Sequence, residues 1–236
     1  MKDNSTLKPG LERLEKIMAH LGLASRREAK SLILKGLVKV NGLIIKNPGH
    51  GINKKNDLIV VESNSLEKKE AILLYKPRGI ETSATNTTTK DIHKLFPQYK
   101  HLSPIGRLDK ESEGLIILTN DGILTKSLTK INSNIEKIYL VNTREFATDE
   151  SLRKMSQGII LDKIITKPAK TNRITRKSFT ISLKEGRKHQ IRRMCDACKL
   201  TIESLIRIQI GNLKIEKMKP GNSRLLNNTE ISSLKI

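Results

Sequence analysis

The chain has 236 residues and a formal net charge of +21, with 45 Lys and Arg against 24 Asp and Glu. Hydrophobic residues make up 36% of it, enough for one good-sized core or for a small and a medium domain. The sequence excludes a membrane helix and a signal peptide, because no apolar run is long enough for either. Two Cys exclude a disulfide scaffold. These features predict a cytoplasmic protein whose partner is a polyanion.

The positive charge has two explanations, which composition alone leaves open. The chain contains 31 Lys and 14 Arg, and a biased codon supply explains part of the Lys excess as well as function does. Arginine is more informative because its planar guanidinium suits phosphate and base recognition. Arg26-Arg27, Arg187 and Arg192-Arg193 stand in basic motifs. The charge therefore indicates a nucleic acid without saying which kind.

A polar, charged segment at 63–70 is predicted to link a domain at 10–62 to a larger one at 71–236. The first domain carries two helical patterns. Apolar residues between Leu11 and Leu21 recur at helical spacing, which predicts a helix over 11–20 that ends at Gly22. Ser25 and Glu28 form a capping box for a second helix over about 26–35, which Gly36 ends.

An alternating segment follows the second helix at 37–45. Its centre, Asn41-Gly42, is typical of a tight hairpin turn, and 57–62 predicts one more short strand. The first domain is thus expected to hold two helices followed by a small sheet.

Four basic residues of this domain are candidate RNA contacts. Arg26, Arg27 and Lys30 lie at the start and along one side of the second helix, and Lys39 follows on the hairpin. A solvated basic face is the simpler interpretation. Two features favour binding: a helix N-terminus also attracts phosphate, and the segment is too small to enclose a cleft of its own.

The string GLASRREAKSLILKGLVKVNG, within a match over about 10–62, resembles the S4 RNA-binding domain. The resemblance implies that the helix starting at Arg26 and the following hairpin bind structured RNA.

Strand and helix patterns alternate in the second part of the chain. Strands are predicted at 71–75, 114–120, 137–143, 178–185 and 203–213, and helices at 123–131, 149–157 (capped by Asp149) and 189–199. The connections are too short for regular βαβ units. We therefore predict an α+β fold with a mixed, largely antiparallel sheet flanked by helices.

Several common catalytic motifs are missing from the sequence. It contains no phosphate-binding P-loop, no nucleophile elbow and no HExxH zinc motif. Cys195 and Cys198 form a single CxxC, whereas a structural zinc site needs four ligands. The sequence therefore predicts neither a metal nor a cofactor.

Two local patterns are candidate chemical sites. GRLDKESEGLIILTNDG at 106–122 places Arg107 and Asp109 in a turn before an apolar strand, and EGRKHQIRRM at 185–194 places basic residues at the start of a helix. YKPRG at 75–79 and EKIYLV at 136–141 are two further motifs. All four, in their order along the chain, resemble the motifs of RsuA-type RNA pseudouridine synthases. This resemblance covers about 70–234.

The resemblance assigns roles to individual residues. It makes Asp109 the catalytic aspartate, Tyr139 the active-site tyrosine and Arg192 the partner of the aspartate. Ile191 is expected to pack on the target base. Arg107, Arg187 and Gln190 are candidate contacts to the RNA. His189 stands where other members often carry a different residue, and we expect it to affect RNA contact rather than catalysis.

The chemistry of pseudouridine formation agrees with these residues. The reaction breaks the N1–C1′ bond of uridine, turns the uracil and joins C5 to C1′, so it needs no redox partner. A carboxylate in an enclosed pocket serves as nucleophile, and a nearby guanidinium such as Arg192 favours its ionised form. Tyr139 would stack on a flipped-out base. Attack of Asp109 on the ribose, attack on the base and a glycal route all remain open.

The sequence thus predicts a monomeric isomerase that converts a uridine in ribosomal RNA to pseudouridine and takes part in rRNA modification and processing. Large-subunit rRNA is favoured over small-subunit rRNA. The alternative is a catalytically inactive S4-type RNA-binding or ribosome-assembly factor.

Overall fold

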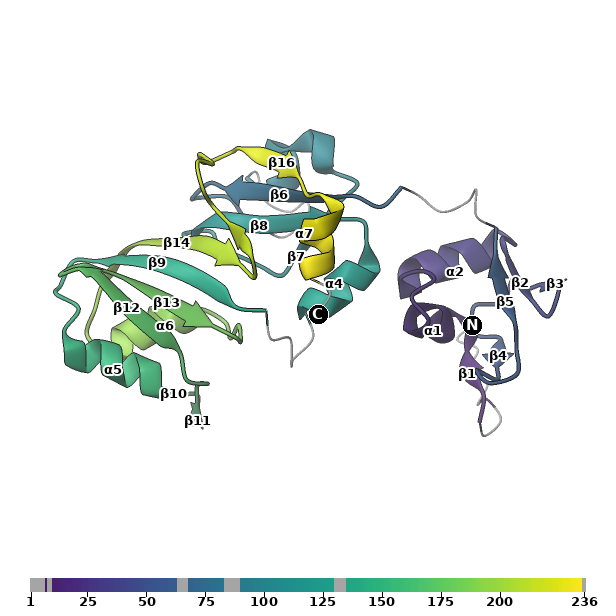
Figure 1. Cartoon of the computed structure of the whole chain (residues 1–236), viewed down its shortest axis with the longest axis horizontal. Helices are drawn as coiled ribbons and strands as arrows, with labels where there is room; N and C mark the ends of the chain where they lie inside the picture. The colour runs from purple at the N-terminus through teal and green to yellow at the C-terminus, as the bar shows by residue number, and fades with distance from the viewer. Residues whose placement is uncertain (1–6, 8–9, 63–67, 83–89, 130–134, 235–236) are drawn as a thin grey trace. The chain divides into compact units, whose positions relative to one another are not determined.

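The computed structural model describes residues 7, 10–62, 68–82, 90–129 and 135–234 (Figure 1). These residues form two compact units, one mainly of Met1–Lys69 and the other of Glu70–Asn120 and Leu124–Ile236. Most of the predicted linker, 63–67, lies outside the described residues. No helix in the described ranges is long and apolar enough to cross a membrane.

The N-terminal unit consists of two helices and short strands. Its elements are β1 (Glu12–Arg13), α1 (Leu14–His20), α2 (Arg26–Leu34), β2 (Val38–Val40), β3 (Leu43–Ile44), β4 (Gly51–Ile52) and β5 (Ile59–Val61). The strands β3, β2 and β5 form one antiparallel sheet, and β1 pairs with β4. Apolar side chains of α1 and α2 pack with β2 and β4 into one core.

Local sequence patterns set the boundaries in this unit. The capping box is present, since Ser25 Oγ accepts the backbone N–H of Glu28 while the Glu28 carboxylate accepts that of Ser25. Asn41 and Gly42 both have positive φ, as the predicted hairpin turn requires. The first helix starts at Leu14 rather than residue 11, because Glu12–Arg13 pair with β4 instead.

The C-terminal unit is built on a nine-stranded sheet. Its strands are β6 (Ala71–Lys76), β7 (Ser103–Ile105), β8 (Glu113–Thr119), β9 (Lys137–Thr143), β12 (Lys170–Thr175), β13 (Ser178–Leu183), β14 (Ile202–Ile210), β15 (Leu213–Lys214) and β16 (Ser223–Leu225). The main order is β12-β13-β9-β14-β8-β6-β16. Only β14 and β8 run parallel; every other pair is antiparallel, as predicted.

Strands β6 and β8 are buried on both faces because helices cover each side. Leu73, Leu115 and Ile117 share a core with α4 (Gly122–Thr129) and α7 (Asn228–Ser233). Their alternating neighbours pack instead against α3 (Ile92–Leu95) and the 3-10 helix Pro97–Tyr99. Because successive side chains point to opposite faces of the sheet, the same two strands contribute to two separate cores.

A third core holds the other end of the sheet. Inward residues of β9, β13 and β14 pack with α5 (Asp149–Gln157) and α6 (Gln190–Ala197). In Figure 1 these two helices lie on the same side of this part of the sheet. A small hairpin of β10 (Ile160–Leu161) and β11 (Ile164–Ile165) projects beside it.

The structure corrects two local predictions in this unit and leaves part of a third outside the described residues. Thr148, not Asp149, caps α5, because its hydroxyl accepts the backbone N–H of Ser151. The strand expected over 203–213 is interrupted by a turn at Gly211, where φ is +54°. Helix α4 ends at Thr129 in the described residues, and the rest of the predicted helix, 130–131, lies outside them.

Candidate active site

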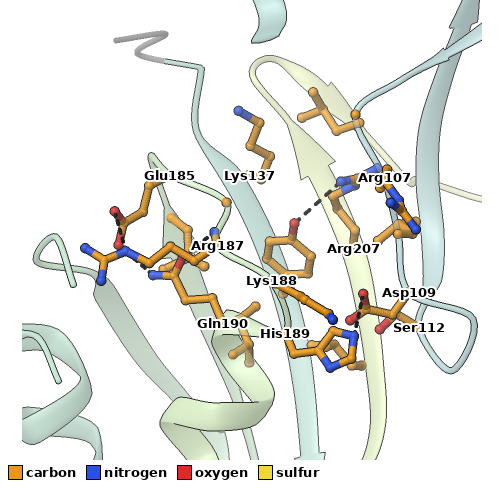
Figure 2. A pocket seen from close by; sticks show the side chains of 18 of the residues that line it. Arg107, Asp109, Ser112, Lys137, Glu185, Arg187, Lys188, His189, Gln190 and Arg207 are labelled. Atoms are coloured by element: carbon orange, nitrogen blue, oxygen red, sulfur yellow. Dashed lines mark hydrogen bonds and ion pairs between the residues drawn. The ribbon is translucent and has the colours of Figure 1, made fainter. Parts of the chain in front are cut away.

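A cavity of about 800 Å³ opens in the C-terminal unit (Figure 2). That volume suits a nucleotide-sized ligand. All seven residues of this unit that the sequence predicts for the site line the cavity: Arg107, Asp109, Tyr139, Arg187, Gln190, Ile191 and Arg192. The fold thus brings together three motifs that are far apart in the chain.

The residues around Asp109 place their side chains in different environments. Leu108 is buried in the core, whereas Arg107 is exposed and Asp109 is partly exposed at the cavity. The buried hydroxyl of Thr82 donates to the Leu108 carbonyl at 2.7 Å and accepts the Leu108 N–H at 3.1 Å. Because both backbone groups are fixed, the direction of the Asp109 carboxylate is fixed as well.

The YKPRG segment supports the same loop from the other side. Lys76 is fully buried, and its ammonium donates to the carbonyls of Pro77 and Ile80 at 2.8 Å each. Burial lowers the pKa of Lys76 to about 8, against the opposing effect of nearby carboxylates such as Glu113. The turn that it holds reaches the catalytic loop, because the Gly79 N–H donates to the Lys110 carbonyl at 2.7 Å.

Two basic side chains flank the Asp109 carboxylate. Arg192 Nε lies 3.8 Å from Asp109 Oδ2, and His189 Nε2 lies 3.5 Å from Oδ1. Arg192 also donates to the carbonyl of Glu111 at 2.9 Å and to the hydroxyl of Ser112 at 3.1 Å. The predicted pairing of Arg192 with the aspartate is thus seen as an ion pair, with the same guanidinium bound to the rest of the loop.

Tyr139 also lines the cavity, beside the buried Arg207. Tyr139 in β9 and Arg207 in β14 are cross-strand partners. The Arg207 guanidinium carbon lies 6.0 Å from the centre of the phenol ring, and its Nη1 donates to the hydroxyl at 3.5 Å. The arginine therefore contacts both the face and the hydroxyl of this tyrosine.

Arg187 and Gln190 line the cavity, but their polar groups already have partners in the protein. Arg187 donates to the carbonyls of Ile164 and Ile165 at 3.0 and 2.7 Å. Gln190 is buried, accepts the Arg187 N–H at 3.0 Å and donates to Glu185 at 2.7 Å. These bonds shape the turn that leads into α6, so in this structure both residues hold the loop that carries His189.

Ile191 has two environments. It lines the cavity, yet only 5% of it is exposed and it packs with the core of α5, α6 and β13. Its contact with the target base stays a prediction that this position allows.

The four predicted RNA contacts of the N-terminal unit are distant in sequence from the residues that line this cavity. Arg27 and Lys30 are exposed on α2. Arg26 is also exposed but pairs with Glu15 at 2.8 Å, and Lys39 pairs with Glu62 at 3.8 Å. Two of the four therefore offer a charge that a carboxylate already partly neutralises.

Three residues of the site have roles that sequence reasoning missed. Thr82 and Arg207 stand outside the chemical motifs, so only the fold shows that they meet Leu108 and Tyr139. His189 is expected to affect RNA contact, and the structure adds that its ring lies against the aspartate. Its left-handed backbone, with φ of +52°, turns the chain sharply at the start of α6 and was not visible in the sequence.

Comparisons with known proteins identify both units. Residues 70–197 match the family model for RNA pseudouridylate synthase, and residues 12–59 match the S4 domain. The chain is 35% identical to ribosomal large subunit pseudouridine synthase B of Bacillus subtilis, over 95% of this chain and 96% of that protein. It is also 35% identical to the dual-specificity RNA pseudouridine synthase RluF of Escherichia coli, over 94% of this chain and 78% of the relative.

A solved pseudouridylate synthase has the same fold, with a TM-score of 0.70 and 31% identity over 94% of this chain and 99% of the other. The chain therefore belongs to the RNA pseudouridylate synthase family, whose members are isomerases that convert uridine in RNA to pseudouridine, and it carries an S4 domain ahead of its synthase domain.

Proposed function

We propose that this enzyme modifies a uridine of large-subunit ribosomal RNA and that Asp109 is its nucleophile. The observation that carries the site is the cavity itself, which Asp109 and Tyr139 both line and in which the Asp109 carboxylate is flanked by Arg192 and His189. The large-subunit target is supported by the name of the Bacillus subtilis relative. Cytoplasmic location, a role in rRNA processing and a monomeric state belong to the same proposal.

Each wall of the cavity has a part in this reaction. The target nucleotide leaves the RNA stack and its uracil stacks on Tyr139, with Ile191 on the apolar side. Asp109 lies between the side chains of Arg192 and His189 and acts on the nucleotide. Arg107, exposed at the rim, is free to bind phosphate or to fill the gap in the RNA.

The target is tested by incubating the purified protein with transcripts of large-subunit rRNA, small-subunit rRNA and tRNA. Pseudouridine is mapped by carbodiimide treatment and primer extension. We expect one new stop in the large-subunit transcript. A stop in the small-subunit transcript alone would overturn the target, and binding without any modification would favour the inactive RNA-binding factor. The tRNA arm is included because one relative is named dual-specificity.

The proposed role of the S4 domain predicts a change in salt dependence. Replacing Arg26 and Arg27 together by Ala removes two exposed charges at the N-terminus of α2. If both contact phosphate, the slope of log affinity against log salt falls by about 1.5, because each neutralised phosphate contributes about 0.7–0.9. The measurement is a filter-binding titration at several salt concentrations.

The matched control is the double variant Lys54→Ala with Lys55→Ala. It removes the same charge from two adjacent exposed residues of the S4 domain, in the turn before β5. We expect its slope to stay near that of the parent. Equal slopes for both double variants would mean that only net charge matters and that α2 makes no specific contact.

A further inference from the structure

The most unusual charge in the synthase domain is that of Arg207. Only 5% of this residue is exposed, and it lines the cavity from the central strand β14. A buried guanidinium ordinarily pairs with a carboxylate, because a buried charge without a partner is strongly destabilising. Among the described residues, no carboxylate oxygen lies within 4.0 Å of it.

The hydrogen bonds of Arg207 also leave it incomplete. Its Nε donates to the Leu115 carbonyl at 2.6 Å and its Nη1 reaches the Tyr139 hydroxyl at 3.5 Å. Its Nη2 is buried and has no partner in the part of the chain that the structure describes. The fold thus tolerates a desolvated cation with an unused donor at the wall of the cavity, beside the tyrosine assigned to the target base.

A second, partly buried basic group lies near Arg207. Lys137 lines the same cavity, and its pKa is lowered first by burial and then by the charge of Arg207. The partly exposed guanidinium of Arg192 is engaged by Asp109 and the loop after it. Arg207 is therefore a buried guanidinium of the cavity whose charge is left for the substrate.

The reaction creates a charge that Arg207 could meet. When the N1–C1′ bond breaks, its electron pair stays on uracil, which becomes an anion delocalised over N1, O2 and O4. The C5 pair then forms the bond to C1′, the C5 proton leaves, and N1 takes up a proton, so the product is an isomer of the substrate. Attack of a carboxylate on the base instead also places negative charge on the uracil oxygens. Both routes need a cation near the stacked base.

We infer that Arg207 stabilises the negative charge that develops on uracil, while it fixes the phenol of Tyr139 against the base. This inference rests on the proposed function of the site. A preorganised charge in a desolvated cavity is worth far more than the same charge in water, and it costs no reorganisation when the anion forms.

The test uses the full-length protein and an RNA fragment carrying the mapped target. Single-turnover rates and RNA affinities are measured for the parent, Arg207→Gln and Arg207→Lys, with uridine or 5-fluorouridine at the target. Cleavage of the N1–C1′ bond is followed as loss of the starting nucleoside in chromatography of nuclease digests, because 5-fluorouridine has no C5 proton to lose and cannot complete the last step as uridine does. Fluorine withdraws electrons and makes uracil a better leaving anion, so it replaces part of the help that Arg207 provides.

On the uridine substrate we expect Arg207→Gln to slow conversion about 10²-fold with little change in RNA affinity. On the fluorinated substrate this loss should shrink at least several-fold. Arg207→Lys keeps a positive charge and should recover part of the rate. If Arg207→Gln does not fold, as judged by circular dichroism, the loss in Arg207→Lys must itself shrink on the fluorinated substrate.

Three results would overturn the inference. An equal loss on both substrates would make Arg207 a purely structural residue. Weaker RNA affinity at an unchanged rate would instead assign it to a phosphate. Unchanged rate and affinity would give it no role in the reaction. Asp109→Asn is measured in the same assay. If it loses activity, the proposed function of the site stands even when the Arg207 inference fails.

Discussion

Replacing Asp109 by Asn is expected to reduce pseudouridine formation at least about 10³-fold, because an amide cannot act as the nucleophile. The change conserves size and leaves the Thr82 clamp on Leu108 in place. It weakens the attraction to Arg192 and His189 but removes no core contact, since the carboxyl group is partly exposed. We therefore expect RNA affinity and folding to be retained. The rate is measured on the mapped rRNA fragment.

Asp149→Asn is the matched control for this experiment. It also removes one carboxylate from the synthase domain, at the first residue of α5, where the side chain is 97% exposed and pairs with Arg173. Its rate should equal that of the parent. Pseudouridine formation by Asp109→Asn at the parent rate would show that another residue carries the chemistry.

The second large effect is expected for Gly114→Ala. Gly114 is the β8 residue that pairs with Arg207 across the parallel junction of the sheet, and its φ is +107°. A Cβ at this position would lie 2.4 Å from the Arg207 carbonyl oxygen and 2.6 Å from its nitrogen. Backbone cannot yield as a flexible side chain does, so the two strands must separate. We expect a loss of about 3 kcal/mol or more in the free energy of unfolding, measured with urea.

Gly221→Ala separates this clash from backbone strain alone. Gly221 also has positive φ, at +89°, but nothing lies within 4 Å of the position of its Cβ. The expected cost is about 1–2 kcal/mol, the price of the left-handed region for alanine. If both variants lost the same stability, close approach of β8 and β14 would not be what requires glycine at 114.

Short-range chemistry made much of this fold predictable. The capping box at Ser25, the turn at Asn41-Gly42 and the alternation in β13 each depend on a few adjacent residues, and the structure confirms them. The errors lie where distant segments decide. Glu12–Arg13 leave the predicted helix because β4, some forty residues on, offers them backbone partners.

The candidate site shows the same contrast between features that local sequence predicts and features that distant segments decide. Motif resemblance selected residues that do line one cavity, Asp109 and Tyr139 among them. It could not show that Gln190 and Arg187 form their hydrogen bonds within the protein, because their partners include the carbonyls of a distant hairpin. It also passed over Arg207, whose significance comes from burial and from an unused donor rather than from its neighbours in the chain.

The parallel pairing of β8 with β14 also sets the order in which the enzyme can mature. Gly114 and Arg207 are joined across this junction, although a long stretch of chain separates them. During synthesis the loop with Asp109 leaves the ribosome well before β14 does. The residues of one wall of the cavity are therefore synthesised before those that β14 contributes. Non-local pairing of this kind is slow to form. The nascent protein therefore carries its S4 domain and its aspartate before it has an active site, and catalysis begins only when the last central strand is inserted.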